Sequence, residues 1–160
     1  MNNSFSVKSI TITSMFIAIS AILSNFKIWG SVSFDAAPAF LASYLLGGTY
    51  GAFVGVIGHL VAAMTSGFPL SFPLHIIIAL EMGLICYISG FLFKDKGKMF
   101  FITPILTFLL NSFVAPLILI FWKDMGLNVY IAMLLPLTIV SFANVLVAVL
   151  LYPMLKKFYL

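Results

Sequence analysis

Residues 46–60 read Leu-Gly-Gly-Thr-Tyr-Gly-Ala-Phe-Val-Gly-Val-Ile-Gly-His-Leu, and this stretch decides how many helices the chain forms. Its first glycines, Gly47, Gly48 and Gly51, lie close enough together to favour a turn over a continuous helix. The apolar residues on either side then form two helices, at 36–46 and 52–64. If the glycines were part of one helix instead, residues 36–58 would be a single span.

The composition identifies the environment of the chain. Of its 160 residues, 63% are hydrophobic and 8% charged, and the mean hydropathy is +1.22. A soluble domain has about a quarter of its residues charged. A bilayer core about 30 Å thick needs roughly 20 apolar residues per helix, so the chain has room for about six or seven crossings. We therefore expect an all-α integral membrane protein, one domain over residues 1–160, with no cleaved signal at its amino end.

Charged residues and turn formers predict the other boundaries of a six-helix bundle. The first span lies between Lys8 and Lys27. Pro73 suits the first turn of a later helix, where its missing N–H is not needed. The further predicted helices are 36–46, 52–64, 73–93, 99–121 and 129–152, joined by the segments 27–35, 65–73, 94–98 and 122–128.

The lysines predict the orientation. Three of them fall in the polar segment 94–98, and Lys156 and Lys157 follow the last span. Because cytoplasmic loops carry an excess of lysine, we expect this segment and the carboxyl end in the cytoplasm. Six spans place both termini there, whereas five place the amino end outside. The net charge of +4 is thus attributed to topology, and no nucleic-acid partner is expected.

Glu81 is the most informative ionisable residue. It lies eight residues into its predicted helix, about 12 Å from the outer end at 1.5 Å per residue. A charge at that depth costs a few kcal/mol unless it faces protein or a water-filled cavity. His59 and His75 are its candidate partners. A Glu–His hydrogen bond that only holds helices together is compatible with a functional role.

Three further polar residues accompany Glu81. Asp35 precedes Ala36 at a position suited to an N-cap. Asn111 and Asn144 fall mid-span, where each amide alone is expected to hold helices together at roughly 0.6 to 2 kcal/mol. Taken together, polar groups from several helices beneath an outer loop containing Phe68 predict an apolar pocket with a few convergent donors and acceptors, as in small-molecule sites.

Several function classes are excluded. The chain has no Gly-Lys-Ser/Thr phosphate loop, no His-Glu-x-x-His and no Gly-x-Ser-x-Gly, so no catalytic residue is predicted. The single Cys86 offers neither a disulfide nor a metal–cysteine site. We expect no metal and no cofactor on this chain. Without an ATP site, uphill transport needs a partner or an ion gradient.

Small residues at four-residue spacing predict close helix contacts. Ser14 and Ala18 form such a pair on the first span, where a partner helix is expected to dock. The same spacing continues within residues 36–64, where we expect packing inside the bundle; these residues are Ala39, Ser43, Gly47, Gly51 and Gly55.

The stretch 46–60 resembles the second-to-third helix signature of substrate-binding S components of energy-coupling factor (ECF) transporters, which are small six-helix vitamin-binding proteins. Many members have Gly-Pro where this chain has Gly47-Gly48. Ser14-x-x-x-Ala18 is similar to the family's Ala-x-x-x-Ala motif, which docks on the transmembrane coupling subunit. The resemblance implies an importer in which this chain, monomeric when isolated, works with that subunit and two ATPases that use ATP.

Within the family, residues 34–41 and 58–82 resemble the alpha-ribazole transporters of cobalamin salvage. The matching pieces include Phe34-Asp35, Gly58-His59-Leu60, Thr65 to Leu70, and Leu80-Glu81-Met82. The implied ligand is a methylated benzimidazole that carries a ribose. The predicted binding residues are aromatics over the ring and polar groups at the ribose and ring nitrogen: Trp29, Phe34, Asp35, His59, Thr65, Ser66, Phe68, His75, Glu81, Asn111 and Asn144.

Other hypotheses stay open at this point. The same fold with another vitamin, such as pantothenate or a pyridoxine-like base, is the first. The chain has no arginine and no lysine at membrane depth, which favours a neutral or weakly basic ligand over an anion. A small membrane enzyme that uses Glu81 and the histidines is the second, and a purely structural subunit is the third.

Overall fold

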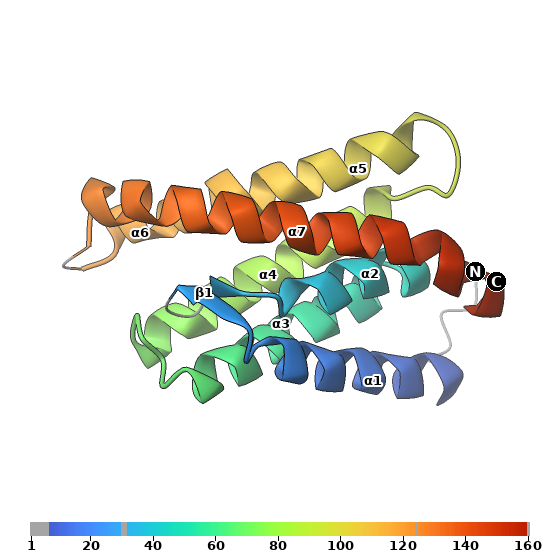
Figure 1. Ribbon diagram of the computed structural model, residues 1–160, viewed down its shortest axis with the longest axis horizontal. Helices are drawn as coiled ribbons and strands as arrows, with labels where there is room; N and C mark the ends of the chain where they lie inside the picture. The colour runs from blue at the N-terminus through green and yellow to red at the C-terminus, as the bar shows by residue number, and fades with distance from the viewer. Residues whose placement is uncertain (1–6, 30–31, 124, 160) are drawn as a thin grey trace.

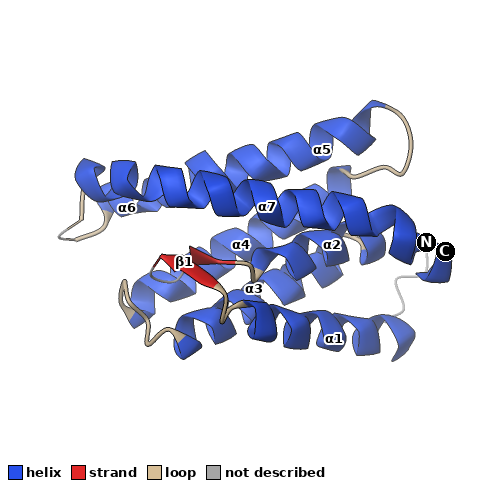
Figure 2. Cartoon of the chain, in the orientation of Figure 1, coloured by secondary structure: helices blue, strands red, loops and turns tan. Residues whose placement is uncertain are grey.

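The computed structural model describes residues 7–29, 32–123 and 125–159, with the backbone alone at Ile28, Trp29 and Tyr159. The described chain is almost entirely helical, with one short hairpin (Figures 1 and 2). Its elements are α1 (Val7–Leu23), β1 (Lys27–Trp29), β2 (Val32–Ser33), α2 (Ala36–Leu46), α3 (Gly48–Thr65), α4 (Phe72–Leu92), α5 (Lys98–Leu109), η1 (Leu110–Val114), η2 (Ala115–Leu117), α6 (Ile118–Phe121) and α7 (Leu127–Tyr159).

The described helices form six antiparallel passes. Elements α5, η1, η2 and α6 follow one another directly, so residues 98–121 make one irregular pass. The hairpin lies at one end of the bundle, and the α4–α5 loop lies at the other end with the last turns of α7 (Figure 1). Four passes are long and apolar enough to cross a membrane, whereas α1 and α2 are shorter, with 17 and 11 residues.

The predicted turn at the glycine cluster is confirmed. Gly47 ends α2 with φ of 94°, in the region that favours glycine, and α3 begins directly at Gly48. The third helix therefore starts four residues before the predicted Ala52. The chain reverses within a single residue, which leaves α2 and α3 as two helices.

The predicted close packing inside the bundle is confirmed at Ser43, Gly51 and Gly55, whereas no described atom lies within 4 Å of a Cβ atom built on Gly47. A Cβ atom on Gly90 would lie 2.3 Å from the backbone nitrogen of Gly48, and one on Gly48 would lie 2.3 Å from the carbonyl oxygen of Tyr87. On the α2 side, a Cβ on Gly51 would overlap the hydroxyl of Ser43. Helices α3 and α4 thus approach backbone to backbone, as small residues allow in lipid.

Helix α2 is the buried centre of the fold. Every residue from Ala36 to Leu45 is buried, and Phe40 is fully so. Its 11 residues rise about 16 Å, roughly half of a bilayer core. The β1–β2 hairpin precedes α2 in the chain. Val32, Ser33 and Asp35, which lie in the segment expected to join the first two helices, are also buried.

The fifth pass changes its winding in the middle. It is α-helical to Leu109, π-helical over Leu110–Val114 and 3₁₀-helical over Ala115–Leu117. Pro116 explains the change, because proline has no N–H to donate and its ring clashes with the carbonyl four residues earlier. The irregular stretch contains Asn111, and such π-bulges are frequent at functional sites.

An ion pair joins the α4–α5 loop to α7. Lys156 Nζ donates to Asp95 Oδ2, and the hydroxyl of Tyr152 donates to Asp95 Oδ1 at 3.0 Å. The hydrogen bond from Lys156 outweighs the opposing effect of burial and, with the Tyr152 hydroxyl, holds the pKa of the Asp95 carboxyl below its ordinary value. Helix α7 continues to Tyr159, beyond the predicted end at Tyr152.

We expect Gly90→Val to lower the free energy of unfolding by about 1 to 3 kcal/mol, because its side chain meets the backbone of Gly48 rather than a movable side chain. Unfolding in mixed detergent micelles, followed by circular dichroism, measures the change. Ala132→Val on the exposed face of α7 is the control and should change stability little. Equal stability of the two variants would contradict the close approach.

Candidate ligand-binding site

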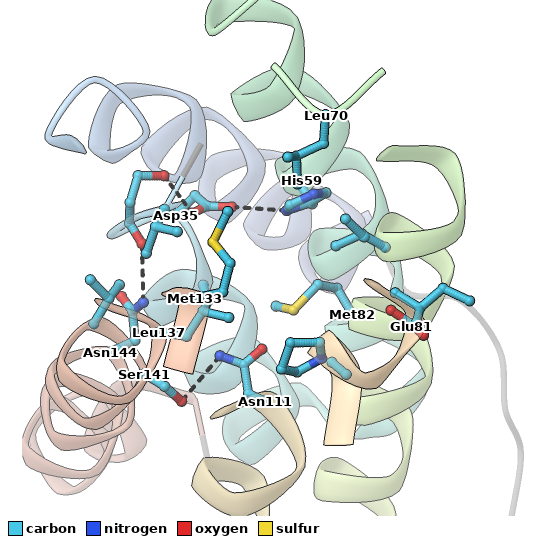
Figure 3. Close-up of a pocket in the computed structure, with 18 of the residues that line it drawn as sticks. Asp35, His59, Leu70, Glu81, Met82, Asn111, Met133, Leu137, Ser141 and Asn144 are labelled. Carbon is cyan, nitrogen blue, oxygen red and sulfur yellow. Dashed lines mark hydrogen bonds and ion pairs between the residues drawn. The ribbon is translucent and has the colours of Figure 1, made fainter. Parts of the chain in front are cut away.

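A cavity lies between the hairpin, the start of α2 and the adjoining parts of α3, α4, η1, η2, α6 and α7 (Figure 3). It encloses about 740 Å³ of empty space, a figure that includes its open mouth. Most of its wall is aliphatic or methionine. The polar lining residues are Ser33, Asp35, His59, Glu81, Asn111, Ser141 and Asn144.

Asn144 ties three elements together at one wall of this cavity. Its Oδ1 accepts the backbone N–H of Ala37 at 3.1 Å, and its Nδ2 donates to the carbonyl of Ser33 at 3.2 Å. The side chain is almost fully buried. The predicted interhelical role is thus confirmed, although the partners are backbone groups of α2 and the hairpin.

Asp35 faces the cavity instead of capping α2. Ser33 Oγ donates to its Oδ1 at 2.6 Å, and its Oδ2 lies 3.6 Å from His59 Nδ1. The predicted N-cap bond is absent in the described chain, so that prediction was wrong. The physical reason is the helical backbone of Asp35 (φ −65°, ψ −23°), whereas a capping side chain needs extended geometry. Asn144 accepts one of the first N–H groups of α2 in its place.

The two histidines extend the chain of polar contacts that starts at Asp35. His59 Nε2 lies 3.4 Å from His75 Nδ1, and the two rings are 5.6 Å apart. His75 is fully buried behind His59 and is not part of the cavity wall. The ring of Phe68, in the α3–α4 loop, lies 5.8 Å from His75. His75 therefore supports His59 from behind.

Glu81 stands on the opposite side of the cavity from Asp35 and Asn144 (Figure 3). Its Oε2 is buried and has no hydrogen-bond partner within the described residues. The predicted Glu–His bond is therefore wrong, because both histidines engage each other and His59 turns to Asp35. A buried acceptor without a partner calls for an explanation. A hydrogen-bond donor on a bound ligand is one such explanation.

Asn111 completes the polar wall from the π-helical segment. Its Nδ2 donates to Ser141 Oγ at 3.1 Å, which joins the fifth pass to α7. In Figure 3 the Asn111 side chain lies at the cavity. The amide thus bridges two helices at the cavity wall.

Five of the predicted site residues line this cavity: Asp35, His59, Glu81, Asn111 and Asn144. Thr65 and Ser66 instead donate to the carbonyl of Ala62 at the end of α3. Phe34, Phe68 and His75 do not line it, and the side chain of Trp29 lies outside what the structure describes.

Sequence reasoning missed Ser33, Ser141 and the methionines Met82 and Met133. Ser141 precedes Asn144 by three residues, the spacing that places two side chains on one helix face. That spacing is a signal that could have found it. The methionines carry no such signal. In an apolar helix, the sequence does not distinguish a methionine that lines a cavity from one that packs in the core or faces lipid.

The small-residue pair of α1 faces outward. Ser14 and Ala18 are both exposed, and Ser14 Oγ bonds only within its own helix, to Ile10 O at 3.1 Å. Ile12, Phe16 and Ser20 occupy the inward face. The pair is therefore accessible to another helix.

Fold and cavity define a class: a multi-pass membrane protein with a cavity inside its helix bundle. The chain belongs to the family described as the ECF transporter, substrate-specific component, whose family model matches residues 8–156. No match was found among curated proteins. Members of this family are transporter subunits of the cell membrane rather than enzymes, and they associate with ECF transmembrane and ATPase subunits and a small-molecule substrate.

We expect Asn144→Ala to lower the free energy of unfolding by about 2 kcal/mol or more, because it leaves a buried N–H and a buried carbonyl without partners. Thermal or detergent-induced unfolding measures the loss. Asn111→Ala is the matched control, since the described bond of its amide is to the Ser141 hydroxyl alone, and should cost about 1 kcal/mol or less. A control as unstable as Asn144→Ala would refute the bridging role.

Proposed function

We propose that this chain captures alpha-ribazole at the outer face of the membrane and delivers it, with its ECF partners, to the cytoplasm. The proposal rests on the resemblance of residues 34–41 and 58–82 to alpha-ribazole transporters and on the chemistry of the cavity. It includes six membrane crossings with both termini in the cytoplasm. The lysines at residues 94–98 and 156–157 support this orientation.

The observation that carries the proposal is the polarity of the cavity lining. Two carboxylates, Asp35 and Glu81, stand on opposite sides of an aliphatic space, and no lysine or arginine is among the described lining residues. An anionic ligand would meet repulsion there. A neutral molecule with several hydroxyl donors and a flat apolar ring matches the lining.

The ribose and the ring then take different parts of the cavity. The ribose hydroxyls donate to Asp35 Oδ2 and to the unpartnered Oε2 of Glu81, because hydrogen bonds to a carboxylate are stronger than neutral ones. The benzimidazole packs against Met82 and Met133, whose sulfur atoms make favourable contacts with aromatic rings. Phe34 and Phe68, which do not line the cavity, are proposed to cover the ring from its outer side.

Isothermal calorimetry of the detergent-purified protein tests the ligand. We expect submicromolar binding of alpha-ribazole, and no comparable binding of riboflavin, pantothenate, thiamine or free dimethylbenzimidazole. Glu81→Gln should weaken alpha-ribazole binding at least about tenfold, a loss of about 1.4 kcal/mol, because the amide is a weaker acceptor for a hydroxyl.

Asp95→Asn, the same change at the far end of the bundle, is the matched control and should bind as the unmodified protein does. If Glu81→Gln binds alpha-ribazole with wild-type affinity, the Glu81 carboxylate does not contact the ligand. Tight binding of pantothenate instead would assign the chain to another vitamin.

We also propose that Ser14 and Ala18 dock on the transmembrane coupling subunit. Both are exposed on α1, and small residues permit close helix contact in lipid. Replacing Ser14 and Ala18 with leucine should abolish co-purification with the ECF partners while ligand binding is kept, since neither residue lines the cavity. Ala132→Leu, on the exposed face of α7, is the control. Full assembly of the double variant would contradict this docking surface.

A further inference from the structure

A second hollow lies at the end of the bundle opposite the ligand cavity, between the α4–α5 loop, the first turn of α5 and the last turns of α7. It holds about 920 Å³ of empty space, including its open side. Its described lining is Asp95, Lys96, Phe100, Tyr152, Pro153, Lys156 and Lys157. None of these residues belongs to the ligand cavity.

The charges at this hollow do not balance. Three lysines face one aspartate, and that aspartate is already occupied by Lys156 and by the Tyr152 hydroxyl. The contact fixes the ammonium of Lys156 at the wall. Lys96 and Lys157, which stand exposed on either side, are left to attract an anion.

The helix that starts at this hollow adds to the attraction. Gly97 precedes α5, and no side chain caps the first turn of this helix. The N–H groups of a helix amino end point outward with a partial positive charge, which favours an anion at that position. Phe100, in the same turn, lines the hollow.

Apolar surface surrounds the charged hollow. Phe100 and Tyr152 form its floor, their rings 6.2 Å apart. Beside it, Phe101, Met154 and Phe158 are largely exposed on α5 and α7, at 69%, 60% and 77%. A free phosphate would use the lysines alone. A molecule with an anionic head and long apolar chains would use both the lysines and these helix faces.

We propose that this hollow binds an anionic phospholipid, with its phosphodiester between Lys96 and Lys157 and its acyl chains along the exposed apolar faces of α5 and α7. Basic pockets between helices at one membrane face are a recurrent form of lipid headgroup site. The proposal does not depend on which vitamin the chain carries, and its site lies apart from Ser14 and Ala18.

The test uses the full chain in nanodiscs made of phosphatidylcholine alone or of an equimolar mixture with phosphatidylglycerol. Native mass spectrometry of protein released from the mixed discs counts the lipids that stay bound. We expect selective retention of phosphatidylglycerol. Lys96→Gln with Lys157→Gln should weaken that retention about 25-fold, since each lysine near an anionic surface contributes about a factor of five.

The control is Lys27→Gln with Lys123→Gln, which removes the same charge outside the hollow and should retain phosphatidylglycerol. Equal retention by both double variants would overturn the site. If inorganic phosphate displaces phosphatidylglycerol, the hollow binds free anions and the proposal of a phospholipid ligand is wrong. If retention is unselective but the Lys96/Lys157 variant no longer joins its ECF partners, the hollow is a protein-docking surface and the lipid proposal fails.

Discussion

The buried amide of Asn144 makes two hydrogen bonds, to the N–H of Ala37 and the carbonyl of Ser33, and these hold the cavity wall in place. The N–H belongs to the first turn of α2, where no carbonyl of the same helix is available to it, and the carbonyl belongs to the last residue of β2. Inside a membrane no water replaces such a partner, and an unpaired group costs several kcal/mol. The position of the hairpin over the start of α2, and with it the direction of Asp35, therefore depends on α7.

The room for a ligand comes from two departures from regular helix. Helix α2 has only 11 residues, and the β1–β2 hairpin, rather than a further helical turn, precedes it and contributes Val32 and Ser33 to the cavity wall. Pro116 interrupts the fifth pass and opens a π-helical turn at Asn111. These irregular elements lie at the cavity, where η1 and η2 contribute Asn111, Ala115 and Pro116 to its wall.

The two ends of the bundle carry opposite chemistry. Carboxylates and amides converge on the ligand cavity at one end, whereas lysines gather around the hollow at the other. Asp95 is the exception at the lysine-rich end, where it pairs with Lys156 and fixes the α4–α5 loop to α7. One end is thus suited to a neutral, hydroxyl-rich molecule, and the other to an anionic membrane surface.

The sequence alone determined the membrane class, the turn at Gly47, most helix boundaries to within about four residues (the end of α7 excepted) and five of the cavity residues. Hydropathy, glycine clusters and lone polar residues at membrane depth act locally, which is why they could be read from the sequence. Only the tertiary structure decided the hydrogen-bond partners. From the sequence, Glu81 was expected to interact with the histidines and Asp35 to cap α2. In the fold, His59 instead lies against Asp35, and the N–H of Ala37 in the first turn of α2 is bound by Asn144, which is 107 residues away in the chain. Partner choice depends on which helix faces meet across the bundle, and in a chain so uniformly apolar no local pattern records that.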